Sequence, residues 1–201
     1  MLHKFPIFIL LCFSVWFLAG CNGGEKADPE AKSESMQTAG NQPAGEVEYT
    51  APESWIKQEP SSHMRKAQYS LPGVNGADSA ELAVFFFPGT GGSVQANLDR
   101  WYGQIKQPDG SSTADKAKSE KIEVGGLQVT VVHVTGTYLK SQSMMMAGPV
   151  EELPDYAMLA AIVETTNGPW FFKAVGPEKT IEHWRPSFDQ FVRTFKIKSS
   201  S

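Results

Sequence analysis

A glycine-rich turn in front of an expected helix is the first candidate for a ligand site in this sequence. Residues 89–93 (GTGGS) follow an apolar run and precede residues with helical periodicity. Backbone amides at such a helix N-terminus can bind phosphate. However, no lysine follows as in a P-loop, and Val94 stands where a dinucleotide-binding motif has its third glycine. We therefore expect a strand-to-helix turn that requires positive φ angles, and no phosphate site.

Three consecutive methionines, Met144, Met145 and Met146, are the side chains best suited to a soft metal ion. Their thioether sulfurs could bind Cu(I), and the pair His63 and Met64 could add further ligands. Surface loops also carry such runs without any metal, and we favour that interpretation. We therefore predict no metal ligand and no cofactor, and keep Cu(I) binding as an alternative.

The three histidines beyond residue 20 do not have the spacing of a metal site. His183 adjoins Glu182, but the HExxH pattern is absent. His133 shares a strand face with apolar residues, which indicates a buried or half-buried structural histidine. His63 lies in a polar segment. No metal ligand is predicted among them.

A nucleophile with a matching base is also missing from the sequence. Ser54 and Lys57 have the SxxK spacing of serine acylases, but that motif requires a helix and this segment has a strand pattern. Four tryptophans could line a groove for a carbohydrate or aromatic ligand, although their spacing is more typical of a core: Trp55, Trp101, Trp170 and Trp184. We therefore predict no catalytic residues and a protein that is not an enzyme.

The first 20 residues have the features of a lipoprotein signal peptide. Lys4 precedes an uncharged apolar run over residues 5–20, which at 16 residues is shorter than a transmembrane helix of about 20. The run ends in the sequence LAGC, which closes on Cys21 and resembles the bacterial lipobox. We predict cleavage before Cys21 and acylation of this cysteine, which would hold the protein at a membrane. An ordinary secretory signal is the alternative.

Residues 21–50 are expected to form the lipidated cysteine and a flexible tether. Residues 22–50 carry six acidic and two basic side chains and hardly an apolar one before Val47. Asn22, in place of aspartate after the cysteine, resembles the outer-membrane sorting pattern of lipoproteins. Residues 51–201 are close to neutral, so no basic patch predicts nucleic-acid binding.

Residues 51–201 predict a single α+β domain. Alternating or continuous apolar residues bounded by turn residues indicate strands over residues 55–58, 64–71, 81–87, 121–124, 127–138, 156–165 and 170–175. Residues 139–155 are expected to form a loop.

Two amphipathic helices are expected in the same domain. The first begins after the N-cap Ser93 and ends before Pro108. Its apolar residues recur with helical spacing at Val94, Leu98, Trp101 and Ile105. The second covers residues 181–195 and has one apolar face, in which Pro186 should produce a kink or a restart.

The predicted order of elements is β-β-β-α-β-β-β-β-α. Hairpin connections favour an antiparallel sheet of about six or seven strands, and two helices with apolar faces must cover it. This order is similar to the PsbP-like fold, an α/β/α sandwich. Several short motifs also resemble an uncharacterised family of exported bacterial lipoproteins: Met64-Arg65, Asn97, Arg100-Trp101, GPWFFK at 168–173 and GPEKT at 176–180. The resemblance covers residues 51–197 and implies a fold without implying a chemistry.

Together these features predict a cell-envelope lipoprotein, anchored to a membrane through Cys21, with the outer membrane favoured. Its domain is expected to bind another macromolecule, such as an envelope protein, at the periplasmic or external side. A small-ligand or Cu(I)-binding protein is the second interpretation, and a hydrolase is the third. A partner surface would be an exposed apolar patch, whereas an enzyme would have a pocket with shifted pKa values.

Overall fold

The computed structural model describes residues 44–89, 91–141 and 149–198. The predicted signal peptide, the lipidation site Cys21 and the run Met144 to Met146 lie outside these residues. None of the helices in the described ranges has the length and apolarity needed to cross a lipid bilayer.

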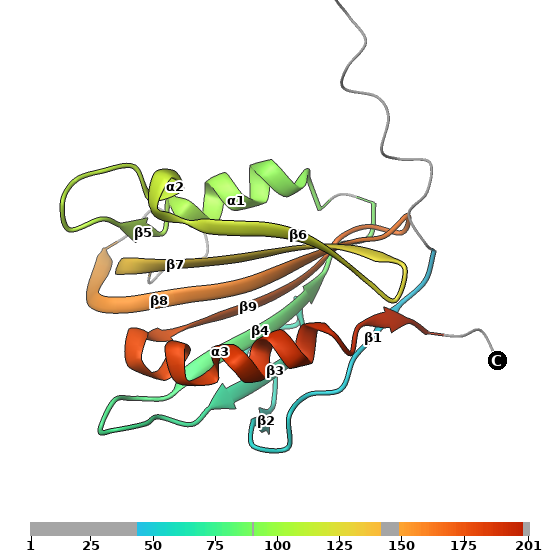
Figure 1. Cartoon of the computed structure of the whole chain (residues 1–201), viewed down its shortest axis with the longest axis horizontal. Coiled ribbons are helices and arrows are strands. Elements are labelled where there is room, and N and C mark those ends of the chain that lie inside the picture. Colours follow the sequence, from blue (N-terminus) through green and yellow to red (C-terminus); the bar gives the residue numbers. More distant parts are fainter. Residues whose placement is uncertain (1–43, 90, 142–148, 199–201) are drawn as a thin grey trace, which may run out of the picture. The chain divides into compact units, whose positions relative to one another are not determined.

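Within the described residues, eight strands form one antiparallel sheet (Figure 1). The order across the sheet is β2 (Ile56–Gln58), β3 (Arg65–Leu71), β4 (Ala80–Phe86), β9 (Trp170–Pro177), β8 (Val150–Glu164), β7 (Leu127–Ser141) and β5 (Ile105–Lys106). Strand β6 (Lys118–Val124) also pairs with β7. The predicted antiparallel sheet is confirmed, with the short strand β5 added.

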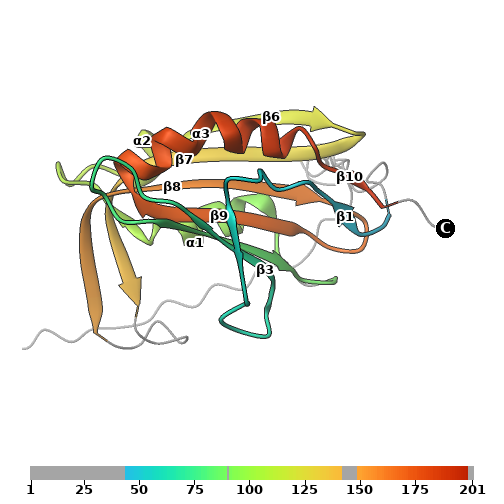
Figure 2. The same ribbon diagram turned by 90° about the horizontal axis from the view of Figure 1, so that it is seen from below.

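Two helices cover opposite faces of this sheet (Figure 2). Helix α3 (Glu178–Val192) packs on one face and α1 (Val94–Tyr102) on the other, so the predicted α/β/α arrangement is confirmed. A single-turn helix, α2 (Thr113–Lys116), was not predicted. Helix α3 includes Pro186 without interruption, so the restart that the sequence allowed does not occur.

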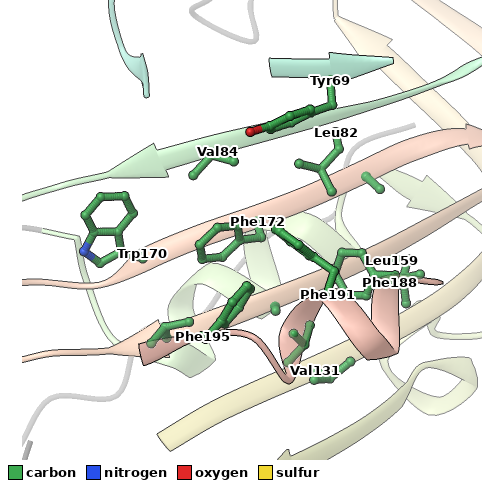
Figure 3. Close-up of a cluster of buried hydrophobic side chains, with 14 of the residues drawn as sticks. Tyr69, Leu82, Val84, Val131, Leu159, Trp170, Phe172, Phe188, Phe191 and Phe195 are labelled. Carbon is green, nitrogen blue, oxygen red and sulfur yellow. The ribbon is translucent and has the colours of Figure 1, made fainter. Parts of the chain in front are cut away.

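The α3 side of the sheet holds the larger of two hydrophobic clusters (Figure 3). The Phe172 ring centroid lies 5.6 Å from that of Phe191 on α3 and 4.4 Å from that of Phe195. All three rings are at most 1% exposed. Each such ring stabilises the fold by about 1.5–3 kcal/mol relative to an exposed one. This cluster therefore fixes α3 on the sheet.

The α1 side holds the second cluster. Met158, Ala160 and Ile162 of β8 face α1, and they alternate with residues that face α3. The rings of Trp101 on α1 and Phe171 on β9 lie 5.8 Å apart, centroid to centroid. Because helices cover both faces, β8 is apolar at successive positions, as expected for a strand buried on both sides.

Helix α1 is shorter than predicted. Ser93 is the N-cap as expected, and its hydroxyl accepts a hydrogen bond from the Ala96 amide at 3.2 Å. The helix ends at Tyr102, and Ile105 pairs with Tyr138 in the sheet. Ile105 is buried in the same cluster as the helix residues. The helical spacing of Ile105 therefore reflects its burial beside the helix residues and does not indicate that the helix continues.

The folded region also begins earlier than residue 51. Strand β1 (Val47–Glu48) pairs with β10 (Lys196–Ile197), and the Tyr49 ring lies 5.1 Å from that of Phe172. The predicted tether is thus wrong over residues 47–50. The pairing joins two segments about 150 residues apart in the sequence, which no local pattern can show.

The predicted loop over residues 139–155 is too long at both ends. Strand β7 continues to Ser141 and β8 begins at Val150. All of these added strand residues are exposed or half-buried. Their polar composition therefore hid the strands from a search for apolar alternation.

Candidate functional site

Two adjoining hollows lie on the α1 side of the sheet and share Phe85 and Lys173 as lining residues. Their volumes are about 510 and 310 Å³, within the range of about 300–1,000 Å³ typical of small-molecule sites. The larger is lined by β3, β4, β7, β8 and β9, and the smaller mainly by α1, β4 and β9. We call the two hollows together the Lys173 site.

Lys173 lies in the middle of β9, and its neighbours across the sheet are small. Phe171 and Val175, two residues to either side, belong to the α1-side cluster, so Lys173 faces the same way. It pairs with Ala83 on β4 and Ala160 on β8. These alanine methyl groups leave room beside the lysine stem, which is why the sheet is hollowed here.

The amino group of Lys173 contacts neutral groups. Its Nζ donates a hydrogen bond to Gln104 Oε1 and lies 5.6 Å from the Trp101 ring centroid and 5.9 Å from that of Tyr138. Burial, and then the positive charge of Arg100, lower the pKa of Lys173 from 10.5 to about 7. The amine is therefore partly neutral near neutral pH.

Helix α1 supplies a second cation to the smaller hollow. The side chain of Asn97 is buried, and its Nδ2 donates to the carbonyl oxygens of Gly91 and Ser93 at 2.7 and 2.9 Å. Its Oδ1 accepts a hydrogen bond of 2.8 Å from Arg100 Nη2. The glycine-rich turn thus orients Arg100 through Asn97.

A hydrogen-bonded polar network holds a third cation at the larger hollow. Arg65 Nη1 donates to Glu81 Oε1 at 2.7 Å and to Gln68 Oε1 at 2.8 Å. Gln68 Nε2 in turn donates to Glu81 Oε2 at 2.9 Å. The Arg65 guanidinium lies 5.8 Å from the ring centroid of Phe85. Glu81 is therefore already engaged by Arg65.

The bent end of the β7–β8 hairpin forms one wall of the larger hollow. It leaves the plane of the sheet on the side opposite α3 (Figure 2). The register shifts between Gly136 and Tyr138, and Gly136 has a φ of +153°. A Cβ at Gly136 would lie 2.7 Å from Ile105 Cγ2 and 2.8 Å from the Lys106 carbonyl oxygen. Only glycine therefore fits the bend without displacement of these atoms.

Basic side chains outnumber acidic ones in the Lys173 site. Among the described residues, Arg65, Arg100, Lys140 and Lys173 line it, against the single acid Glu81. Six aromatic residues share the lining: Phe85, Phe87, Trp101, Tyr138, Tyr156 and Phe171. The arrangement suits an anion that has an apolar or aromatic body, since rings bury the body and cations meet the charge.

The predicted glycine-rich turn is a structural turn. Gly89 and Gly92 have φ angles of +68° and +74°, as expected. The carbonyl oxygens of Gly91 and Ser93 are bonded by Asn97. The turn therefore contributes to the Lys173 site only indirectly, by orienting Asn97 and through it Arg100.

The histidines are not brought together. His133 is 8% exposed on β7, and its Nε2 lies 2.8 Å from Glu182 Oε1 on α3. His183 is exposed on α3 with its ring perpendicular to that of Trp184, and His63 is exposed ahead of β3. Within the described ranges, no three His, Cys, Asp or Glu side chains are grouped to hold a metal ion.

The tryptophans divide between core and site. Trp55 and Trp170 are in the α3-side core and Trp184 is half-buried against it, whereas Trp101 both packs in the α1-side core and lines the smaller hollow. The interpretation of Trp101 as purely structural was therefore incomplete. Lys173 was missed, although a lysine inside the apolar run over residues 170–175 is itself a signal.

No protein-family model matches the chain, and no curated protein matches it. Among solved structures, the chain is similar to a protein of unknown function from Pseudomonas aeruginosa, at 10% identity and a TM-score of 0.47, over 73% of this chain and 99% of that one. It is also similar to the cyanobacterial PsbP of Synechocystis sp. PCC 6803, at 11% identity and a TM-score of 0.43, over 85% and 100%. A third similar structure is LpqN, involved in cell envelope biogenesis of Mycobacterium tuberculosis, at 10% identity and a TM-score of 0.45, over 80% and 87%. Likeness at this level assigns no residue a role.

Proposed function

We propose that this protein is a lipid-anchored binding protein of the cell envelope, and that its domain binds a small organic anion with an apolar body in the Lys173 site. The observation that carries the proposal concerns two cations in a site walled by six aromatic residues. Arg65 and Lys140 are paired with Glu81 and Glu151, whereas Arg100 and Lys173 have no carboxylate within ion-pair distance among the described residues. Glu81, the one acid in the described lining, is hydrogen-bonded to Arg65 and Gln68. Arg100 and Lys173 can therefore meet the charge of a ligand whose body lies against Trp101.

A small ligand explains the described surface better than a macromolecular partner does. The large apolar side chains exposed among the described residues are Ile56, Met64 and Val150, at 58%, 43% and 48%. They lie on β2, ahead of β3 and at the start of β8, and one exposed apolar residue at each place is ordinary for a protein surface. The hollows, in contrast, have the size and mixed lining of ligand sites.

Three ligands of one shape and different charge test the proposal. Phenylacetate, phenylacetamide and phenethylamine are titrated into the full chain held in nanodiscs, and tryptophan fluorescence reports binding next to Trp101. We expect phenylacetate to bind about tenfold more tightly than the neutral amide, equal to about 1.4 kcal/mol, and phenethylamine to bind most weakly. Equal affinity for the acid and the amide would contradict the proposal.

Charge-neutralising variants locate the site. Arg100→Gln and Lys173→Met should each remove most of the preference for phenylacetate over phenylacetamide. Lys121→Gln is the matched control, since Lys121 is an exposed lysine on β6 outside the lining of the site. If all three variants keep the preference, the anion binds elsewhere.

The membrane anchor needs its own test, because Cys21 lies outside the described residues. Intact-mass measurement of the protein from bacterial membranes should show cleavage before Cys21 and added acyl chains. Cys21→Ser should remain an uncleaved precursor without acyl mass. An unmodified Cys21 in the purified protein would remove the anchor from the proposal and leave the ligand site unaffected.

A further inference from the structure

Lys173 is unlike the other lysine of the same site. Lys140 is exposed, and its Nζ lies 3.3 Å from Glu151 Oε2. In the described part of the chain, Lys173 has no carboxylate within ion-pair distance, and its Nζ contacts an amide oxygen and two aromatic rings. It also lines both hollows, so a ligand in either one can reach it. This is the environment of a nucleophilic amine.

We propose that Lys173 forms a reversible imine with aldehydes or ketones that also carry an anionic group, which makes the Lys173 site a carbonyl-binding site. The inference rests on the proposed function, because the anionic group is what Arg100 would hold while the carbonyl carbon approaches Lys173 Nζ. It adds to that function the chemical class of the ligand.

The reaction consumes no oxidant or reductant. The lone pair of neutral Lys173 Nζ attacks the carbonyl carbon, and the carbonyl π electrons move to oxygen. The nitrogen then releases one of its two protons and the oxygen takes up one. The resulting carbinolamine loses its hydroxyl group and the remaining amine proton as one water molecule, and a carbon–nitrogen double bond forms. Hydrolysis reverses each step, so the ligand is released unchanged.

The geometry favours this step at Lys173. An amine attacks only when it is neutral, and burial together with the Arg100 charge lowers the pKa of Lys173 to about 7. Gln104 Oε1 accepts a hydrogen bond from Nζ and so holds the amine at the junction of the hollows. The rings of Trp101 and Tyr138 flank the amine, with centroids 5.6 and 5.9 Å from Nζ.

A matched pair of probes tests the inference. Carboxybenzaldehyde and (hydroxymethyl)benzoate, both para-substituted, differ in the aldehyde alone. Each is added to the full chain in nanodiscs with cyanoborohydride, which reduces an imine to a stable secondary amine, and peptide mass spectrometry locates the adduct. We expect both probes to bind, the aldehyde to label Lys173 at about tenfold lower concentration than Lys140, and the alcohol to label nothing.

The outcomes separate the two proposals. Lys173→Arg keeps the positive charge and cannot form an imine, so it should bind both probes and lose the preferred adduct. If the probes bind equally and wild-type Lys173 and Lys140 are labelled alike, the carbonyl inference is overturned and anion binding stands. If neither probe binds, both proposals are overturned. The comparison of Lys173 with Lys140 is made in the wild-type protein and does not depend on the folding of a variant.

Discussion

The Nζ atom of Lys173 lies 5.6 Å from the ring centroid of Trp101, yet the lysine does not have the pKa of a stabilised cation. A cation over an aromatic face gains about 0.5–2 kcal/mol. Burial destabilises the charged form of Lys173 by more than this gain, and repulsion from Arg100 destabilises it further. The pKa of Lys173 therefore falls to about 7. Keeping Lys173 charged in this site therefore costs free energy, and a bound anion would reduce that cost.

The lowered pKa of Lys173 should make the free energy of unfolding depend on pH. Between pH about 7 and about 10.5, Lys173 is protonated in the unfolded chain and neutral in the folded one. The free energy of unfolding therefore rises with pH through this window, by at most about 1.4 kcal/mol per pH unit. Urea unfolding from about pH 7 to 9.5 should show this rise in the wild type and lose it in Lys173→Met. Parallel curves for the two proteins would contradict the shifted pKa.

The bend at Gly136 should be necessary for the wall of the larger hollow. Gly136→Ala is expected to lower the free energy of unfolding by about 1–3 kcal/mol and to weaken phenylacetate binding, because the new methyl group collides with Ile105 and Lys106. Gly126→Ala is the control, since Gly126 has a φ of +76° but nothing within 4 Å of the added Cβ. The control also places a Cβ on a residue with positive φ, but without the collisions, and should retain binding.

Truncations on α3 should separate two kinds of aromatic residue. Phe188 is fully buried, and Phe188→Ala should cost about 3–5 kcal/mol. Trp184 is half-buried and donates from Nε1 to the Pro72 carbonyl oxygen at 2.8 Å, so Trp184→Ala should cost about 1–3 kcal/mol. Denaturant unfolding measures both. A loss below about 1 kcal/mol at Phe188 would mean that α3 is not packed as described.

The pKa of His133 should lie below the ordinary histidine value of 6.5. Burial is the largest cause of its lowered pKa, Glu182 opposes it, and Arg185 and Lys118 add to it. Between the folded pKa and about 6.5 the unfolded chain holds more protons, so this contribution to stability is present above about pH 6.5 and is lost as the pH falls. Glu182→Gln should lower the pKa of His133 further, as followed by NMR. Glu123→Gln, an exposed acid on β6, should leave it unchanged.

Local regularities in the sequence determined most of the elements. Ser93 followed by apolar residues at helical spacing predicted the start of α1, and the alternating strand after the Gly125 turn predicted the β6–β7 hairpin. These patterns succeed because a residue's period reports which face it buries. They fail where a residue is buried on the same face as a helix without being part of that helix. Ile105 has helical spacing from the residues of α1 but lies in a strand.

Only the tertiary structure decided the Lys173 site. The site joins three elements that are far apart in the sequence: Arg65 lies on β3, Arg100 on α1 and Lys173 on β9. Antiparallel pairing sets Arg65 opposite Phe85 and Phe85 opposite Phe171. Trp101 packs against Phe171 and so holds α1 on the same face. The same holds for β1, which pairs with the far end of the chain. Contacts between distant segments depend on register and on which strands are neighbours, and neither leaves a local period in the sequence.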